Sequence, residues 1–448
     1  MTALRCFRVG IVLLATLITG YLALAQDGSR PIQPPPDLDG VDFIYHGVNV
    51  GNVDAAANSG GAAKNDGTPG ATTKPLQTEI DAYLKATKRT SIAWVNFAQV
   101  ISKEDDAIFP ADKCKSVAGY NAVPFINLVT PGPGVMLEGS NANGWTLKKE
   151  WTDAINKWGQ GAGAYIKGAG ANQKALIIAW GAGCNSDSSC WKMKGDPERF
   201  KTTYAAIQSA INAAVDKAAA DKDKAVDKDK AADKDKAVDK EKKENPKLSD
   251  NITWVFQIQV SATPDSSPRF EDFYPSPNAK VDWIGASIFG ASTTSKEKDK
   301  TTPTPAPDDP SSGASAIDKK PTLTPLAVQF GPYYHRIREM DSVKPIIIAA
   351  FGCPDTLDSG SMCWARDALQ ALASEPRRFP KVIGFAWFDS SSPFDYCAGA
   401  PQSSKGESLD LGMDVNSVVA GVFPRFLADP KVFSWPSFKK WVKPKIQD

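Results

Sequence analysis

Eight short apolar or β-branched runs recur along the chain, and helix-like stretches lie between most of them. The runs are at 42–48, 91–97, 123–129, 175–180, 252–260, 281–289, 345–351 and 382–388. Repeated strand-then-helix units predict parallel strands that are joined by crossover helices. We therefore expect an α/β fold, a closed (β/α)8 TIM barrel over 42–442. A doubly wound open sheet is the alternative, but no GxGxxG or GxxxxGK[ST] loop supports it.

Several of the helical stretches have clear sequence signals. Aspartate precedes proline at Asp196-Pro197, which is typical of an N-cap followed by the first helical residue. The remaining helical stretches are expected at 148–165, 326–340, 364–372 and 415–427.

Two low-complexity inserts, at about 216–246 and 293–321, interrupt the alternation. The first contains a six-residue Asp/Lys/Ala/Val repeat from Asp221 to Lys240. Six residues is not a helical period, so no apolar stripe forms, and the repeat is neutral. It is interpreted as a solvated extension of the preceding helix or as disorder. The second insert is rich in Ser, Thr, Pro, Asp and Lys and is typical of a long loop.

The first 25 residues have the pattern of a secretory signal peptide. Arg5 and Arg8 precede an apolar run that ends at Ala23-Leu24-Ala25. A charged segment, an apolar segment and a small-x-small site are typical of such peptides. We expect cleavage, a linker at 26–41, and a secreted protein without a membrane segment. A retained signal anchor is the alternative.

Secretion changes how the cysteines are interpreted. Of the seven cysteines, Cys6 leaves with the signal peptide and six remain. An even number in an oxidising compartment suggests three disulfides, with free buried thiols as the alternative. Two pairs are close in sequence, and the third follows only by elimination: Cys184–Cys190, Cys353–Cys363 and Cys114–Cys397. Asn251 begins the one glycosylation sequon that we identify, Asn-Ile-Thr.

Composition excludes several function classes. The 52 basic and 51 acidic residues give a net charge of +1, whereas a nucleic-acid-binding protein would show a clustered basic excess. The two histidines, His46 and His335, exclude a three-histidine metal site. We expect no metal, no cofactor, no nucleic-acid partner, and a monomer.

The carboxyl ends of the predicted strands carry amides and aromatic side chains. In a (β/α)8 barrel these ends build the active site. Aromatic faces stack on pyranose rings and amides bind sugar hydroxyls, although aromatics at strand ends are also common in cores. The polar and aromatic residues at these ends are Asn49, Asn96, Gln99, Asn127, Thr130, Gln257, Gln259, Ser287, Trp94, Trp180, Phe289 and Trp387.

Carboxylates are missing from the predicted strand ends. The nearest ones follow in loops, at Asp187, Asp355, Asp389 and Asp395. A glycosidase needs two carboxylates that face the scissile bond. The expected catalytic pair is therefore not evident.

Several segments resemble glycoside hydrolase family 26, the β-mannanase family, in the right order. The segments at 270–275 and 281–285 resemble its "YPG…YVDWIG" stretch, and 251–256 resembles the strand before it. The segment at 344–352 resembles "KPIMIAEFG". Residues 175–191 resemble "RPWHEMNG..W..W", and 384–389 resemble the "WFN" strand. The resemblance covers most of the chain outside the inserts and implies the same barrel.

The resemblance also implies that both catalytic glutamates are absent. The family nucleophile falls on Ala350, and the acid/base, aligned on Trp180, falls on Ala182. The neighbouring family histidine, asparagine and tyrosine fall on Gly181, Cys184 and Phe289. The sugar-binding positions that we predict are Trp180, Asn185, Trp191, Asn127, Phe289, Trp387 and Asp389.

Three functions are compatible with these residues. The favoured hypothesis is a catalytically inactive protein that binds a β-mannan or β-glucan polysaccharide. The first alternative is an active β-glycosidase that uses relocated carboxylates, such as Asp187, Asp355 or Asp389. The second alternative is a cell-wall or matrix scaffold in which the Lys/Asp repeat is the interacting element.

Overall fold

The computed structural model divides the chain into two compact units, Met1–Val41 and Asp42–Asp448, and every residue described below belongs to the second. The described residues are 45–50, 76–87, 92–140, 144–169, 175–186, 189, 196–226, 247–261, 268–275, 277, 279–290, 323–353, 358–373 and 378–388. The expected signal peptide and linker lie outside them. So do the second insert and the helix expected at 415–427.

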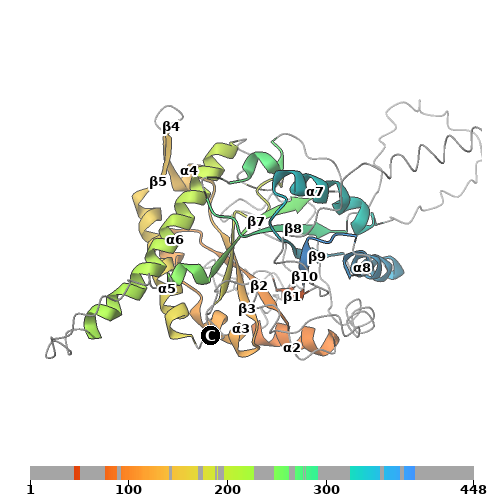
Figure 1. Ribbon diagram of the computed structural model, residues 1–448, viewed down its shortest axis with the longest axis horizontal. Helices are drawn as coiled ribbons and strands as arrows, with labels where there is room; N and C mark the ends of the chain where they lie inside the picture. Colours follow the sequence, from red (N-terminus) through yellow and green to blue (C-terminus); the bar gives the residue numbers. More distant parts are fainter. Residues whose placement is uncertain are drawn as a thin grey trace, which may run out of the picture. The chain divides into compact units, whose positions relative to one another are not determined.

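Eight parallel strands form a closed barrel, in the order β1-β10-β9-β8-β7-β6-β3-β2 (Figure 1). Each strand falls on one of the eight apolar runs. The bounds are β1 Tyr45–Asn49, β2 Trp94–Val100, β3 Val123–Val129, β6 Leu176–Trp180, β7 Ile252–Val260, β8 Trp283–Phe289, β9 Ile346–Gly352 and β10 Val382–Phe388. The predicted (β/α)8 barrel is confirmed, and the doubly wound alternative is wrong because the parallel pairing of β1 with both β2 and β10 closes the sheet.

Helices connect the strands and cover the barrel. Their bounds are α2 Leu76–Thr87, α3 Ala111–Gly119, α4 Pro133–Met136, α5 Lys149–Gly168, α6 Pro197–Val226, α7 Leu326–Met340 and α8 Asp358–Ala373, with short 3-10 helices η2 Glu104–Asp106, η3 Leu248–Asn251 and η4 Phe270–Phe273. The side chain of Asp196 caps α6 as predicted, accepting a hydrogen bond of 3.0 Å from the Arg199 amide. The α6 backbone continues into the Asp/Lys repeat as far as Val226.

The lower part of the barrel lumen is filled by large side chains. Tyr45, Trp94, Phe125 and Trp283 are all buried there and belong to one apolar cluster. Two glycines admit the Trp94 indole: a Cβ at position 47 would lie 2.6 Å from its Nε1, and one at position 384 would lie 2.4 Å from its Cη2. The barrel is therefore a packed core rather than a pore.

A short antiparallel hairpin interrupts the connection from β3 to α5. Its strands are β4 Leu137–Ser140 and β5 Gly144–Leu147. Because it follows β3, it lies on the side of the barrel where the parallel strands end. No helix in the described part of the chain is both long and apolar enough to cross a membrane.

One of the expected disulfide pairs is wrong. Cys114 is a free thiol on the inner side of α3, completely buried, and that burial raises its pKa. The carbonyl of the same residue accepts a hydrogen bond from Tyr165. Its predicted partner, Cys397, lies outside the described residues.

The other two cysteine pairs stay predictions. Cys184 and Cys353 are fully buried, and no disulfide joins any two of the cysteine side chains that the structure describes. Cys190 and the side chain of Cys363 fall outside that part of the chain.

Candidate functional site

A layer of amide side chains lines the upper lumen, where the strands end. The Nδ2 atoms of Asn49 and Asn96 both donate to the carbonyl of Ala349, at 3.3 and 3.2 Å. Asn127 donates in turn to Oδ1 of Asn96, at 2.8 Å. The three asparagines are buried, so this network is shielded from solvent.

A second polar pair belongs to the neighbouring strands β7 and β8. Gln257 Nε2 donates to Ser287 Oγ at 2.8 Å, and both side chains are completely buried. None of the eight barrel strands contains Asp or Glu. The strand ends therefore present neutral hydrogen-bonding groups and no acid or base among them.

Ala350, the residue at the family nucleophile position, is completely buried on β9. It lies beside Ser287 in the register of β8 and β9, just past an irregularity at Ala286/Ser287. This irregularity shifts the β9 pairing by one residue, and the carbonyl of Ala349 is the acceptor of the amide network. A methyl group at position 350 can neither attack a sugar nor carry a proton.

Ala182, the residue at the family acid/base position, lies in the turn after β6 and is 6% exposed. It stands between Gly181 and Gly183, whose φ angles are +63° and +65°. A Cβ at Gly181 would lie 2.5 Å from Cε2 of Phe200, so this turn has no room for the histidine of the family motif. The turn is fixed to the barrel because the Gly183 amide donates to the Gln257 carbonyl at 2.9 Å.

Trp180 and Asn185 belong to the protein core. The Trp180 ring is stacked on Phe200 with centroids 5.2 Å apart, and its Nε1 donates to Thr130 Oγ1. The Asn185 amide is bonded to the backbone of Gln259 through both of its polar atoms. Their positions do not support the predicted contacts with sugar.

Trp387 and Phe289 are also buried. The Trp387 ring meets Phe351 edge-on at 4.9 Å, and Phe289 meets Phe388 edge-on at 5.5 Å. The exposed fractions of Trp387 and Phe289 are 0% and 8%, so these rings pack within the core as described. Of the predicted sugar-binding set, Asn127 lies in the amide layer, while Trp191 and Asp389 fall outside the described residues.

The glycosylation prediction at Asn251 is not supported by its environment. Asn251 is 7% exposed at the end of η3, and its Nδ2 donates to the Leu248 carbonyl at 2.9 Å. The atom that would carry a glycan is thus already engaged inside the fold.

Trp145 on β5 is an aromatic residue that sequence analysis missed. It is only partly buried, and the guanidinium of Arg199 lies over its ring at 3.7 Å. Asp196 holds that guanidinium by an ion pair of 2.8 Å. The hairpin and the start of α6 thus fix a partly exposed indole on the side where the strands end. A signal was available, because Trp145 lies between Gly144 and alternating residues that suit a hairpin.

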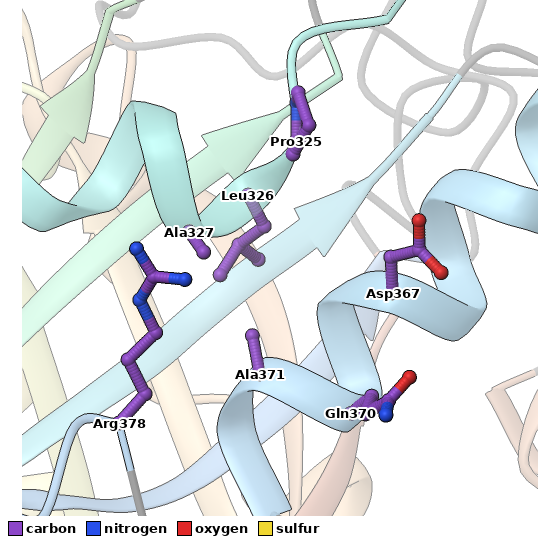
Figure 2. Close-up of a pocket in the computed structure, with 7 residues that line it drawn as sticks. All are labelled: Pro325, Leu326, Ala327, Asp367, Gln370, Ala371 and Arg378. Atoms are coloured by element: carbon purple, nitrogen blue, oxygen red, sulfur yellow. The ribbon is translucent and has the colours of Figure 1, made fainter. Parts of the chain in front are cut away.

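Two pockets on the outside of the barrel lie away from the amide layer. One, of about 360 Å³, lies between the start of α7 and the end of α8. Figure 2 shows Arg378 and Asp367 on opposite sides of this pocket, with Leu326 and Ala371 between them. The other, of about 340 Å³, lies between α3 and α5 and includes Phe109 and Tyr165. No group of three His, Cys, Asp or Glu side chains that could hold a metal is found among the described residues.

Comparison with solved structures relates this geometry to known proteins. A double mutant of the endo-β-1,4-mannanase from Cellulomonas fimi matches at 12% identity and a TM-score of 0.50, over 91% of this chain and 76% of that chain. The chain has the fold of the family 26 glycoside hydrolases. A modular family 26 endo-β-1,4-mannanase from Cellulomonas fimi matches at 11% identity, a TM-score of 0.49 and the same coverage.

A β-mannanase from a symbiotic protist of the termite Reticulitermes speratus also matches this chain. Identity is 11% and the TM-score is 0.42, over 90% of this chain and 91% of that chain. No family model matches the sequence, and no curated protein matches it.

Proposed function

We propose that this protein is a secreted, catalytically inactive member of the family 26 type that binds β-mannan or a related β-glucan. The observation that carries the inactivity is that none of the eight barrel strands contains an Asp or Glu, and that their ends carry neutral amides instead. Hydrolysis of a glycosidic bond needs two positioned carboxylates, whereas binding needs surface and hydrogen-bonding groups.

The two alanines at the family's catalytic positions support the loss of hydrolysis. General acid–base groups each contribute roughly 10²- to 10⁴-fold to the rate, and loss of the nucleophile also removes the covalent route. The surroundings have changed as well, since Gly181 faces the Phe200 ring where the family has a histidine. Several changes in one place favour a site that no longer performs chemistry.

Trp145 is the described aromatic side chain best placed to contact a glycan. It is partly exposed on the hairpin that follows β3, and Arg199 and Asp196 fix one side of it. An indole held rigidly in this way can stack on a pyranose at little cost in conformational entropy. The resemblance of the strands to family 26 makes β-mannan the first glycan to test.

The test is affinity electrophoresis of the mature protein in gels with soluble galactomannan or mixed-linkage β-glucan. We expect retardation by one of these glycans, and weaker retardation of the Trp145→Ala variant. The matched control is Val343→Ala, which removes a side chain that is 63% exposed where the chain enters β9, at the opposite end of the barrel. Unretarded migration of the wild-type protein with both glycans would refute the binding function. Equal retardation of the wild-type protein and both variants would show that Trp145 and its hairpin are not part of the binding surface.

A further inference from the structure

The orientation of each side-chain amide in the lumen network is fixed by its hydrogen-bonding partner. The carbonyl of Ala349 can only accept, so Asn49 and Asn96 must both turn their Nδ2 atoms toward it. Asn96 then presents Oδ1 to Asn127, which must donate through its own Nδ2. As a result, the network leaves Oδ1 of Asn127 at its open end.

Two buried amide oxygens in the upper lumen accept no hydrogen bond from any group that the structure describes. They are Oδ1 of Asn127 and Oε1 of Gln257. Gln257 uses its nitrogen to donate to Ser287, which leaves its oxygen without a donor. Both side chains are at most 1% exposed, and buried polar atoms of this kind are normally hydrogen-bonded to protein or ordered water.

The strand between these two residues carries a small side chain at this level. β6 lies between β3 and β7 in the barrel, and Asn127 is paired in register with Ala179. Ala179 is paired on its other side with Val255, two residues before Gln257. Ala179 contributes only a methyl group to the lumen, and β6 ends one residue later at Trp180, whose ring packs on Phe200 of α6. Asn127 and Gln257 therefore flank a stretch of β6 that fills little of the lumen.

From this arrangement we infer a binding site in the lumen, between Asn127 and Gln257, for a neutral molecule that donates hydrogen bonds through a hydroxyl group. Both orphan atoms are carbonyl oxygens, and no strand supplies a carboxylate that would favour a cation there. In the free protein the donor is an ordered water, which can donate to both oxygens at once. If the protein binds glycans as proposed above, a sugar hydroxyl is the second source of the same donor.

A crystal structure of the mature protein at about 1.5 Å, with and without mannotetraose, tests the site. Without sugar, we expect an ordered oxygen about 2.8 Å from Oδ1 of Asn127 and within hydrogen-bonding distance of Oε1 of Gln257. With mannotetraose, a sugar hydroxyl in the same place would show that a glycan can supply the donor. An unchanged water would show that water is the donor in both states. Absence of any ordered oxygen, or a protein group donating to Oδ1 of Asn127, would overturn the inference. If water fills the site and the protein binds no glycan, the inferred site is supported and the proposed function is refuted.

A pair of variants makes the result specific. Gln257→Met removes one of the two acceptors, and we expect the ordered oxygen to disappear or to shift toward Asn127. Gln329→Met is the matched control, because Oε1 of Gln329 is also buried without a donor, but this residue lies on α7 outside the barrel. If mannotetraose reaches the site, Gln257→Met should weaken its binding by about five- to tenfold, the effect of one hydrogen bond. An ordered oxygen that is unchanged in Gln257→Met and lost in Gln329→Met would contradict the assignment.

Discussion

The side chain of Asn185 bonds both backbone groups of Gln259, as the backbone of a neighbouring strand would. Its Nδ2 donates to the Gln259 carbonyl and its Oδ1 accepts from the Gln259 amide, each at 2.8 Å. The turn after β6 is thereby fixed to the end of β7 through a side chain. The amide that sequence analysis assigned to sugar binding instead holds in place the turn that contains Ala182.

This pairing predicts that Asn185→Ala destabilises the protein by about 1–3 kcal/mol, because two partly buried backbone groups of Gln259 lose their partner. Urea unfolding measures the loss, and hydrogen exchange should show faster exchange of the Gly183 and Gln259 amides. Gln208→Ala is the matched control, because Gln208 bonds both backbone groups of Lys280 in the same way. It should cost a similar free energy while leaving exchange after β6 unchanged. An equal increase at Gly183 in both variants would contradict the local role of Asn185.

A second prediction concerns the glycine that replaces the family histidine. Gly181→Ala should destabilise the fold by more than about 1 kcal/mol, because φ is +63° and the new Cβ would meet Phe200 at 2.5 Å. Gly331→Ala is the control: it lies within α7 with open space where a Cβ would stand, and should stabilise by about 0.5–1 kcal/mol. Thermal unfolding of the two variants measures both changes. Similar melting temperatures for the pair would show that the turn is not constrained as described.

A third prediction concerns acid stability. Burial by itself raises the pKa of Asp341, but the hydrogen bond from Tyr274 at 2.8 Å, Lys344 and two backbone amides hold that pKa below its usual 3.8. A lowered pKa stabilises the folded chain above about pH 4, and this contribution is lost as the pH falls through the folded-state value. Tyr274→Phe should therefore cost about 1.5 kcal/mol at pH 7 and clearly less at pH 2.

The control for this pH dependence is Tyr165→Phe. Tyr165 donates to the uncharged carbonyl of Cys114, so its contribution should be the same at pH 2 and pH 7. Urea unfolding at the two pH values measures both variants. A cost for Tyr274→Phe that does not change with pH would show that the ionised form of Asp341 is not what the hydroxyl stabilises.

The barrel was predictable from sequence because its strands are short apolar runs with long helical connections. All eight runs became strands, and the N-cap at Asp196 was confirmed. Helices α2 and α3 and the β4–β5 hairpin were missed. α3 buries few large side chains, since Cys114, Val117 and Ala118 are its buried residues, and its apolar stripe is short.

The candidate site was less predictable, because an aromatic or amide residue in a strand can face the lumen or the helices. Trp180 is at the end of β6, yet its ring packs on Phe200 of α6. Asn127 points the other way and joins the lumen network. The irregularity between β8 and β9, which makes the Ala349 carbonyl an acceptor for two asparagines, has no sequence signal that distinguishes it.

A gain-of-function experiment follows from the two alanines. The double variant Ala182→Glu, Ala350→Glu should recover little β-mannan hydrolysis, because Gly181 and Phe289 do not supply the hydrogen bonds that orient such groups. Reducing-sugar release by this variant and by each single variant is the measurement. Activity approaching that of a mannanase would show that only the two carboxylates had been lost.

The central claim is that this barrel binds glycan without cleaving it, and reducing-sugar release from soluble β-mannan by the wild-type protein tests it most directly. We predict no release above that of a heat-inactivated sample, over hours and at enzyme concentrations in the micromolar range. Steady release by the wild-type protein that Asp389→Asn abolishes would contradict the claim and would establish a glycosidase with relocated carboxylates.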